Sequence, residues 1–487
     1  MSRAVLERAR QRPELGSRIE TFRALFDAAG VRRIGLALDN GPDWIAADLA
    51  ALADDRVVVP LAPFFSPVQL QHALDSADCQ AVLTESVDTV RPGWLPARFA
   101  DDLRQAGHRL WLDPDRSLRG LPPGTFKISF TSGTTGRPKG ICLSAAQMEQ
   151  VALALLERTA AAAIERHLCL LPLAVLLENV AGAWSAILGD MTLIVPRQRE
   201  CGFSGSSGLD SARWLDCLER HRPHSIIVLP QMLKLLHALV VDQRYDPSDL
   251  RMVAVGGART PPGLIEAARR VGLPVHEGYG MTECGSVICL NAPGQDRTGS
   301  VGRPLRHLQL RTDATGQILI DGPHHLGQVG TTAAPARQWA TGDRGSIDAQ
   351  GFVHIEGRIG NSYCTAWGRN IAPEWIEAEL DAQPEIAQSF VHGRELPANV
   401  AVVVPSGHGD PAAAVDRANA GLPDYARISL WCIRQQPFGP VDGSATSNGR
   451  LCRSRLFELH QTELERLIRE LGSAPAFLLN QTERIPA

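Results

Sequence analysis

The chain has 487 residues, more than one hydrophobic core usually holds, so it should divide into two or more domains. Its composition, with 44% hydrophobic residues, 21% charged residues and a net charge of −4, is that of an ordinary globular protein. Because no basic run stands out and aromatic residues make up only 5%, nucleic acid is excluded as an expected partner.

The cysteines and the apolar stretches indicate the compartment. Ten cysteines show no C-x-x-C pair and no regular spacing, which favours reduced thiols in a cytoplasmic protein. Residues 1–18 are charged throughout and lack the apolar core of a signal peptide. Glu178 and Asn179 interrupt the most apolar long stretch, so we expect no membrane span.

The first 120 residues alternate two kinds of pattern. Helix-like spacing at 19–30 and 66–78 is separated by apolar, strand-like runs at 32–38, 57–63 and 80–85. Strand–helix alternation of this kind predicts an α/β sheet with parallel strands.

The alternation continues through the middle of the chain. Ser144 and Gln147 form an S-x-x-Q capping box that should begin a helix running through 151–165. Thr260-Pro261-Pro262 should begin a later helix with a cap and a proline in its first turn. We also expect strands at 169–173, 191–196, 224–230 and 251–258, helices at 178–188 and 231–240, and a loop at 201–208.

From about Gly299 the pattern changes to short strands such as 317–322 and 352–357, which indicates a smaller β-rich section. A helix that begins with proline follows at 373–380. The predicted fold is therefore α/β, with a large N-terminal domain of α/β subdomains plus the β-rich section, at 1–357, and a smaller, mobile α+β C-terminal domain, at 358–487.

A glycine-rich stretch, FTSGTTGRPKG at 130–140, is suited to holding an anion. It is not a Walker P-loop, because Pro138 and Gly140 stand where that motif needs Gly and a hydroxyl residue. Backbone N–H groups of such a turn, small hydroxyls and Lys139 could still surround phosphate oxygens. A plain polar surface turn is the alternative, and the density of Gly and Thr before Pro-Lys-Gly disfavours it.

This stretch resembles the phosphate loop of the adenylate-forming superfamily, which includes acyl- and aryl-CoA synthetases, peptide-synthetase adenylation domains and luciferases. Four further motifs of that family occur in the same order: GGA at 256–258, GYGMTE at 278–283, TGD at 341–343 and Gly357-Arg358. The resemblance covers nearly the whole chain and is nearest to acyl-CoA synthetases. It implies that phosphate is held by Thr131, Ser132, Gly133, Thr134, Thr135, Gly136 and Lys139.

The resemblance also implies roles for the other motifs. The turn Gly256, Gly257, Ala258 would lie along the adenine of ATP, with Tyr279 stacked near the ring. Thr282 would bind the α-phosphate and Glu283 a magnesium ion, for which carboxylate and phosphate oxygens are suitable ligands. Asp343 would hold both ribose hydroxyls, and Arg358 would also reach the ribose at a domain hinge.

The chemistry implied is that of an AMP-forming ligase. A small carboxylic acid attacks the α-phosphate of ATP, pyrophosphate leaves, and the acyl-adenylate passes its acyl group to a thiol of coenzyme A or a carrier-protein phosphopantetheine. Positioning and charge neutralisation would supply the rate, and the small domain rotates between the two half-reactions in this family. Neither the acid nor the acceptor can be chosen from the sequence.

Three positions depart from the family pattern. Gly360 replaces the usual Asp or Lys of the hinge, and glycine still permits a pivot. Arg450 stands where the catalytic Lys of the small domain is usual, and its planar fork cannot act as a compact ammonium. We therefore hypothesise that adenylation is slowed, or arranged differently, while thioester formation is less affected. Val175 and the Asp-free stretch 228–233 favour an alkyl or aryl acid without a charged amine.

Two further enzymatic or binding functions compete with the acid–thiol ligase. One is an adenylating enzyme with an amine or another non-thiol acceptor, and the other is a weakened homologue that binds nucleotide or acyl-adenylate as a partner. Cys284 is more plausible as a packing residue than as a nucleophile. The histidine pairs at 221/224 and 324/325 have no carboxylate or Cys at useful spacing, so we do not interpret them as metal sites.

Overall fold

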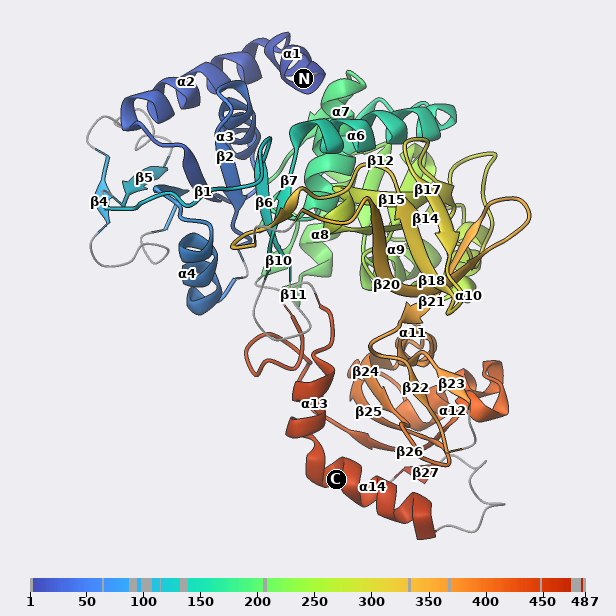
Figure 1. Cartoon of the computed structure of the whole chain (residues 1–487). Helices are drawn as coiled ribbons and strands as arrows, with labels where there is room; N and C mark the ends of the chain where they lie inside the picture. Colours follow the sequence, from blue (N-terminus) through green and yellow to red (C-terminus); the bar gives the residue numbers. More distant parts are fainter. Residues whose placement is uncertain are drawn as a thin grey trace.

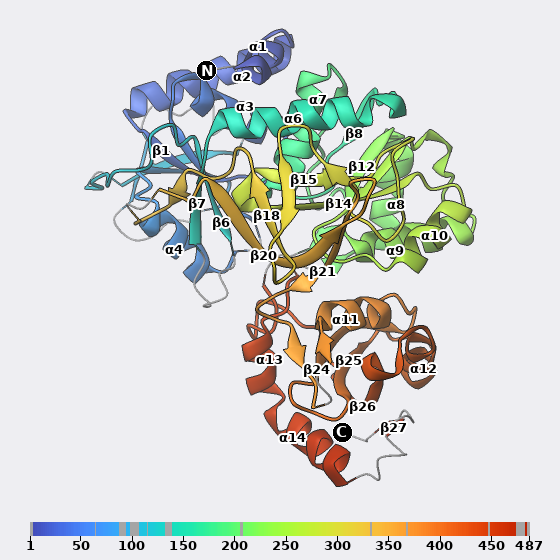
Figure 2. The same cartoon turned by 45° about the vertical axis from the view of Figure 1, so that its right-hand side comes forward.

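The computed structural model describes residues 3–63, 65–86, 94–97, 107–113, 115–131, 139–204, 208–331, 334–366, 369–446, 449–473 and 483–484. Figures 1 and 2 show a large body formed by the first three quarters of the chain and a smaller C-terminal body next to it.

The first sheet has eight described strands in the order β19-β7-β6-β2-β1-β3-β5-β4. Its centre, β6-β2-β1-β3, is parallel, and the remaining pairs are antiparallel. The strands are β1 Arg33–Ala37, β2 Val57–Pro60, β3 Ala81–Thr84, β4 Leu95–Pro96, β5 Arg109–Leu112, β6 Lys127–Thr131, β7 Lys139–Leu143 and β19 Gly327–Gln328. The helices are α1 Ala4–Arg10, α2 Pro13–Ala29, α3 Pro42–Ala53 and α4 Pro67–Ser76.

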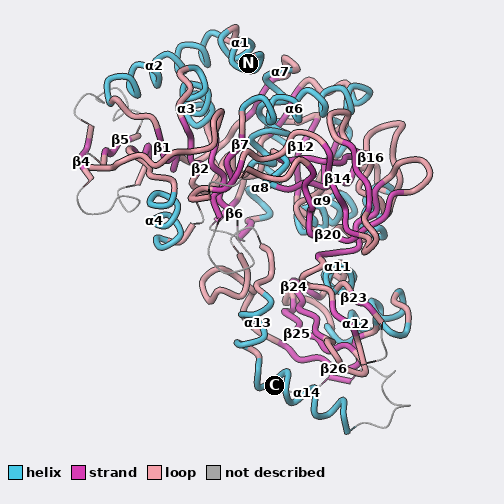
Figure 3. Tube along the Cα trace, in the orientation of Figure 1, coloured by secondary structure: helices cyan, strands magenta, loops and turns pink. Residues whose placement is uncertain are grey.

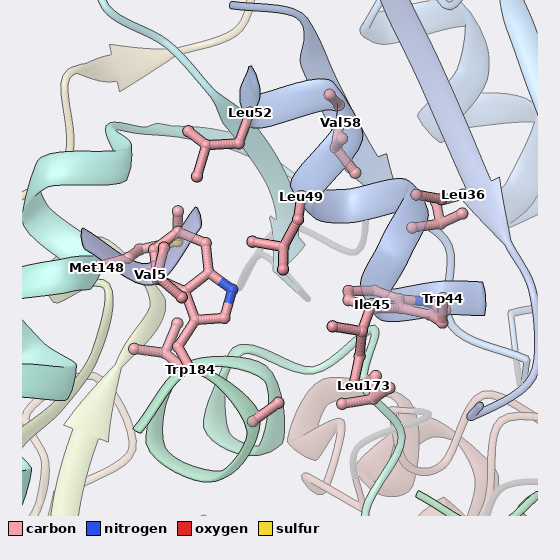
Figure 4. Close-up of a cluster of buried hydrophobic side chains, with 14 of the residues drawn as sticks. Val5, Leu36, Trp44, Ile45, Leu49, Leu52, Val58, Met148, Leu173 and Trp184 are labelled. Carbon is pink, nitrogen blue, oxygen red and sulfur yellow. The ribbon is translucent and has the colours of Figure 1, made fainter. Parts of the chain in front are cut away.

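Helices cover both faces of this sheet, as doubly wound connections require. Helices α1 to α3 lie on one face and α4 on the other (Figure 1). Helix α4 begins with a full capping box, in which Ser66 and Gln69 each accept from the other's backbone N–H. Figure 4 shows the core beneath α3, where Trp44 and Leu49 pack with residues as distant in sequence as Trp184.

This apolar core contains one buried ion pair. Lys127, with no exposed surface, lies 2.8 Å from Asp48 and donates to Asn179 at 2.5 Å. The rings of Trp44 and Trp184 lie 5.5 and 5.6 Å from the ammonium. Pairing, hydrogen bonding and aromatic faces together offset the cost of burying the charge.

The second sheet follows the order β16-β15-β14-β13-β12-β8-β9 and is parallel from β14 to β9. Its strands are β8 Arg166–Leu168, β9 Thr192–Ile194, β12 Ser225–Val228, β13 Met252–Val255, β14 Val275–Met281, β15 Ser286–Leu290 and β16 Arg303–Pro304. The accompanying helices are α6 Ala145–Thr159, α7 Ser185–Leu188, α8 Ser211–His221, α9 Pro230–Val241 and α10 Pro262–Arg270, with 3-10 turns Ala160–Ala162, Pro247–Asp249 and Thr282–Cys284. A short hairpin joins β10 Phe203–Ser204 to β11 Gly208–Leu209.

A π-helix at Leu177–Trp184 runs between the two sheets. Its Glu178 is fully buried, accepts the backbone N–H of Leu171 at 2.8 Å and lies 2.9 Å from His167 Nε2. The other ring nitrogen of His167 lies 2.8 Å from the hydroxyl of Ser225. These bonds satisfy the buried polar groups and tie the π-helix to strands β8 and β12.

The β-rich section and the C-terminal body complete the fold, and Figure 3 shows their strands and helices. The β-rich sheet is β17 Gln309–Thr312, β18 Gln317–Asp321, β20 Gln338–Ile347 and β21 Val353–Arg358. The C-terminal body has the sheet β24 Ile386–His392, β25 Asn399–Pro405, β26 Ile428–Ile433 and β27 Glu483–Arg484, and the pair β22 Tyr363–Cys364 and β23 Asn370–Ile371. Its helices are α11 Pro373–Asp381, α12 Pro411–Gly421, α13 Arg453–Leu459 and α14 Gln461–Ser473, with a 3-10 turn at Asp424–Ala426.

The predicted α/β class, with its β-rich section and smaller α+β part, is confirmed. The bounds 1–357 and 358–487 and the mobility of the second part remain predictions. The segment 169–173 is not a strand, because β8 ends at Leu168. The helix expected through 151–165 ends at Thr159, since Ala163 adopts a left-handed conformation. The segment 178–188 lies in the π-helix and α7.

Two expected helix caps differ in detail. Ser144 accepts the N–H of Gln147 at 3.1 Å, but the Gln147 side chain does not return to complete the box. It donates instead to the carbonyl of Glu283 at 3.1 Å. Helix α10 does begin with Pro262, whereas Thr260 provides no cap, because Pro261 is the capping residue.

Candidate active site

Strand β14 and the turn after it carry the GYGMTE motif. Tyr279 lies in the strand, which bulges between Tyr279 and Gly280, and Thr282 and Glu283 lie in the 3-10 turn after it. Gly280 is required sterically, since a Cβ there would lie 2.0 Å from the carbonyl oxygen of Ser286. The close approach of the Gly280 and Ser286 backbones therefore fixes the positions from which the side chains of the motif extend.

Asp343 of the TGD motif lies directly beside Tyr279. Its carboxylate, in a residue only 4% exposed, accepts the Tyr279 hydroxyl and pairs with Arg358 Nε at 2.9 Å. Burial raises the pKa of Asp343, and the positive charge of Arg358 opposes that rise. Burial also raises the pKa of the Tyr279 hydroxyl, and the Asp343 charge adds to that rise, so the phenol stays protonated as a donor.

The hairpin of β20 and β21 brings Asp343 and Arg358 together, because the two residues are register partners. Thr341 supports both: its hydroxyl accepts the Asp343 N–H at 3.0 Å, and its carbonyl accepts Arg358 Nη1 at 2.9 Å. Sequence analysis did not single out Thr341, although it is the first residue of TGD. A hydroxyl two residues before an aspartate was the signal that could have identified it.

Two long-range bonds hold the backbone of Glu283. Its carbonyl accepts the N–H of His325 at 2.6 Å and the Gln147 amide at 3.1 Å. The segment that begins at His325 then pairs with the strand of Lys139, because Leu326 and Val329 donate to Cys142 and Gly140. Glu283 and the strand that begins at Lys139 are thus joined through one short segment.

The GGA turn ends strand β13 next to the same motif. A Cβ on Gly256 would lie 3.2 Å from the carbonyl oxygen of Gly278, and Gly257 has a φ of +83° that favours glycine. Gly257 and Ala258 are both exposed. Nearby, burial raises the pKa of Glu277 to about 7, although an N–H from Thr260 opposes the rise.

Arg450 reaches this site from the C-terminal body. Its guanidinium interacts electrostatically with Arg358, Asp343 and Glu283. Burial, and after it the positive charge of Arg358, lowers the pKa of Arg450, and the two carboxylates oppose that fall. Part of the surface of Arg450 is exposed to water. Arg450 and Arg358 therefore place two cations beside the carboxylate of Asp343.

The sequence-predicted residues fall into two groups. The structure brings together Tyr279, Thr282, Glu283, Asp343, Arg358, Arg450 and the turn 256–258, and it places Lys139, which is exposed, at the start of the adjoining strand β7. Ser132, Gly133, Thr134, Thr135 and Gly136 lie outside the described residues, and only the backbone of Thr131 is described, at the end of β6 opposite Lys139.

Cys284 and Gly360 have simple structural settings. Cys284 is fully buried in an apolar cluster, and burial raises the pKa of its thiol, so it packs and stays protonated. No described atom would meet a Cβ on Gly360, and its φ is not in the left-handed region. Sterics in this conformation therefore do not require glycine at that position.

The arrangement can hold a sugar and a phosphate chain at once. Buried Asp343 presents acceptors suited to hydroxyl groups, while Arg450, Arg358 and the nearby Lys139 strand provide cations for phosphate oxygens. Glu283 adds a carboxylate suited to a hard metal ion. The fold and the site together define an enzyme that binds a nucleotide between a large and a small body.

Comparison with known proteins agrees with that class. The model of the AMP-binding enzyme family matches residues 13–329, and the chain belongs to this family. A 2-succinylbenzoate–CoA ligase of Bacillus velezensis is 27% identical over 472 residues, which are 89% of this chain and 88% of the relative.

Two solved structures share the fold. The o-succinylbenzoate CoA synthetase of Bacillus subtilis in complex with the acyl-adenylate intermediate OSB-AMP superposes with a TM-score of 0.75 and 21% identity, over 94% of this chain and 98% of that one. The amide bond synthetase McbA of Marinactinospora thermotolerans gives 0.70 and 21%, over 91% and 94%. Among the described helices of this chain, none has both the length and the apolar character that a bilayer crossing requires.

Proposed function

We propose that this protein joins a carboxylic acid to ATP, releases pyrophosphate, and transfers the acyl group from the resulting acyl-adenylate to the thiol of coenzyme A. The observation that carries the proposal is the convergence of Tyr279, Asp343 and Arg358 with Arg450, which arrives from the other body. Family membership and the coenzyme A ligase among its relatives support the same reaction.

Asp343 is suited to the ribose. A carboxylate offers about four lone-pair sites, and Tyr279 and Arg358 occupy two of them, which leaves acceptors for two hydroxyl groups. We assign the turn 256–258 and the ring of Tyr279 to the adenine. Lys139 and the loop before it would hold the outer phosphates, whose charge then leaves with pyrophosphate.

Glu283 is suited to magnesium. Its backbone carbonyl is fixed by Gln147 and by the N–H of His325, and among the described residues none donates a hydrogen bond to its carboxylate, which is free to act as an oxygen ligand. When bound, the ion would neutralise phosphate charge during the displacement. We assign the hydroxyl of Thr282 to the α-phosphate.

Arg450 would stabilise the charge that develops as the acid oxygen attacks the α-phosphorus. Its positive charge interacts with both Asp343 and Glu283. Removal of one such donor typically costs about 100- to 1,000-fold in rate. The attack needs no covalent enzyme intermediate, since the adenylate itself carries a good leaving group.

We propose an aromatic acid as the substrate class, in keeping with the relative named for 2-succinylbenzoate. Leu229 packs against Gly257, so the stretch 228–233 presents an apolar side chain next to the turn and no carboxylate for an amine. A fatty acid is the alternative substrate. Amine acceptors are the alternative to coenzyme A, and the shared fold with an amide bond synthetase favours testing them. A carrier-protein phosphopantetheine is a third acceptor.

One assay series tests the proposal. Exchange of labelled pyrophosphate into ATP is measured with a panel of aromatic, fatty and amino acids, and AMP release is then followed with coenzyme A, a carrier protein or an amine. We expect exchange with aromatic acids and thiol-dependent AMP release with coenzyme A. If no acid supports exchange, the protein is not an acid-activating ligase. If only amines promote AMP release, coenzyme A is not the acceptor.

A further inference from the structure

Lysine is rare in this chain, and its few positions are specialised. Only three of the 49 Lys and Arg residues are lysines: Lys127, Lys139 and Lys234. Lys127 is the buried partner of Asp48, and Lys139 begins the strand after the glycine-rich loop. Lys234 has neither setting. A compact ammonium and a planar guanidinium are not interchangeable. We therefore expect the third lysine, Lys234, at a position where several acceptors surround one ammonium group.

Lys234 joins the two bodies. It lies on α9 of the large body, and its Nζ donates to the carbonyl oxygens of Asp381 at 2.8 Å, Ile386 at 3.0 Å and Gln383. These three acceptors use all three N–H donors of an ammonium. Burial lowers the pKa of Lys234, and the charges of Asp381 and Glu385 oppose that fall.

The acceptors of Lys234 surround the C-terminal end of α11. A helix leaves its last carbonyls without partners there and carries partial negative charge, which a cation stabilises. Helix α11 ends at Asp381, and Figures 1 and 2 both place it at the junction of the two bodies. Lys234 therefore fixes one end of this helix to the large body.

The middle of the same helix holds the segment that carries Arg450. Glu377 of α11 is buried and forms a two-pronged ion pair with Arg453, at 2.9 and 2.6 Å. Burial alone would lower the pKa of Arg453, yet the Glu377 charge raises it, so the guanidinium stays positively charged. Arg453 begins α13, only three residues after Arg450.

The backbone of Arg450 is also held by the segment that precedes it. Thr446 donates its N–H to the carbonyl of Arg450 at 2.7 Å, and its hydroxyl accepts the N–H of Arg450 at 3.1 Å. Ala445 and Leu451 pair across the turn. The backbone of Arg450 is thus held by Thr446 before it, and Arg453 fixes the chain three residues after it.

We propose that Lys234 is a positioning residue for the adenylation step: it anchors α11, and α11 through Glu377 and Arg453 holds Arg450 over the nucleotide site. This inference rests on the proposed function. Lys234 touches no reacting group, so it acts through Arg450 and affects only the half-reaction that uses the observed arrangement of the two bodies.

The kinetic test separates the half-reactions. Lys234→Met is compared with Arg244→Met, a matched loss of a cation at an exposed position just beyond the end of the same helix. We expect acid-dependent pyrophosphate exchange to fall roughly 10- to 100-fold in Lys234→Met, and AMP release from supplied acyl-adenylate with coenzyme A to change little. Lys234→Arg should recover only part of the loss. Equal losses in both half-reactions, or equal behaviour of the two Met variants, would overturn the proposal.

A second background tests the route through Arg450. In Arg450→Ala, the further change Lys234→Met should cost nothing more in exchange, because the group that it positions is gone. Additive losses would show that Lys234 acts in another way.

A distance measurement tests the anchoring role of Lys234 independently of catalytic activity. Cys364 is exposed in the C-terminal body and Val241 is exposed at the end of α9, so spin labels on Cys364 and on Val241→Cys report the relation of the two bodies. We expect Lys234→Met to broaden or displace the distance distribution, and Arg244→Met to leave it unchanged. An unchanged distribution in Lys234→Met refutes the anchor. If the unaltered protein shows no acid-dependent exchange, the proposed function fails, and the distances alone decide the role of Lys234.

Discussion

Replacing Asp343 by Asn tests the nucleotide site with the least change in shape. In the structure this carboxylate already accepts Tyr279 and Arg358 Nε, so its remaining lone pairs are the ones assigned to the ribose. The amide keeps the volume but loses the charge and one acceptor. A hydrogen bond to a charged group contributes about 1.5–3 kcal/mol and one between neutral groups about 0.5–1.5 kcal/mol. Two weakened bonds therefore cost about 2 kcal/mol, or roughly 30-fold.

The loss should appear in ATP binding. Because the ribose does not react, its bonds contribute equally to the ground state and the transition state, so KM for ATP rises and kcat changes little. Pyrophosphate exchange measured over a range of ATP concentrations separates the two constants. Urea unfolding is the control: the Arg358 side chain is 37% exposed, so water can solvate its charge when Asp343 is neutralised, and stability should change little. An unchanged KM for ATP would refute the ribose assignment.

Three further changes have defined outcomes. Asp48→Asn leaves the Lys127 cation unpaired in the core and should lower the free energy of unfolding by about 3 kcal/mol in urea titrations. The double variant Asp48→Leu with Lys127→Met should restore most of that loss, and equal losses in the two variants would contradict the ion-pair account. Arg450→Lys should raise the rate of pyrophosphate exchange, and an unchanged or lower rate would remove the idea that arginine slows adenylation. Because the pKa of Glu277 is raised from 4.5 to about 7, its stabilising contribution is complete below pH 4.5 and is lost as the pH rises through 7. Glu277→Gln should thus gain up to about 3 kcal/mol of stability over the original chain between pH 4.5 and 8 in urea titrations, and parallel pH profiles of the two proteins would contradict this.

The local signals in the sequence predicted the elements that local chemistry determines. Pro373 at the start of α11 and the apolar run of β12 are examples, since a proline in the first turn and a buried strand can both be read from neighbouring residues. The segment 169–173 was misassigned because an apolar run by itself cannot distinguish a strand from a buried connection. The true strand, β8, contains a buried His167 whose bonds to Glu178 and Ser225 come from elsewhere in the chain.

The candidate site divides in the same way. Motifs such as GYGMTE and TGD could be recognised because their spacing is local, and the residues they contain do lie together. Gln147 and His325 could not be found, since their bonds to Glu283 join residues 136 and 42 positions apart and leave no periodic trace. The link from Lys234 to α11, across 147 residues, was hidden for the same reason.

The π-helix at Leu177–Trp184 has a consequence for how this chain aligns with others. Each of its hydrogen bonds spans one more residue than in an α-helix, so the segment contains more residues than an α-helix with the same number of turns. Removing a single residue between Asn179 and Trp184 would let the segment wind into an α-helix while the parts before and after the deletion keep nearly the same orientation. Glu178 could then still face His167 and Trp184 could still face Asp48, so a homologue with a plain helix here should show a one-residue gap in the alignment.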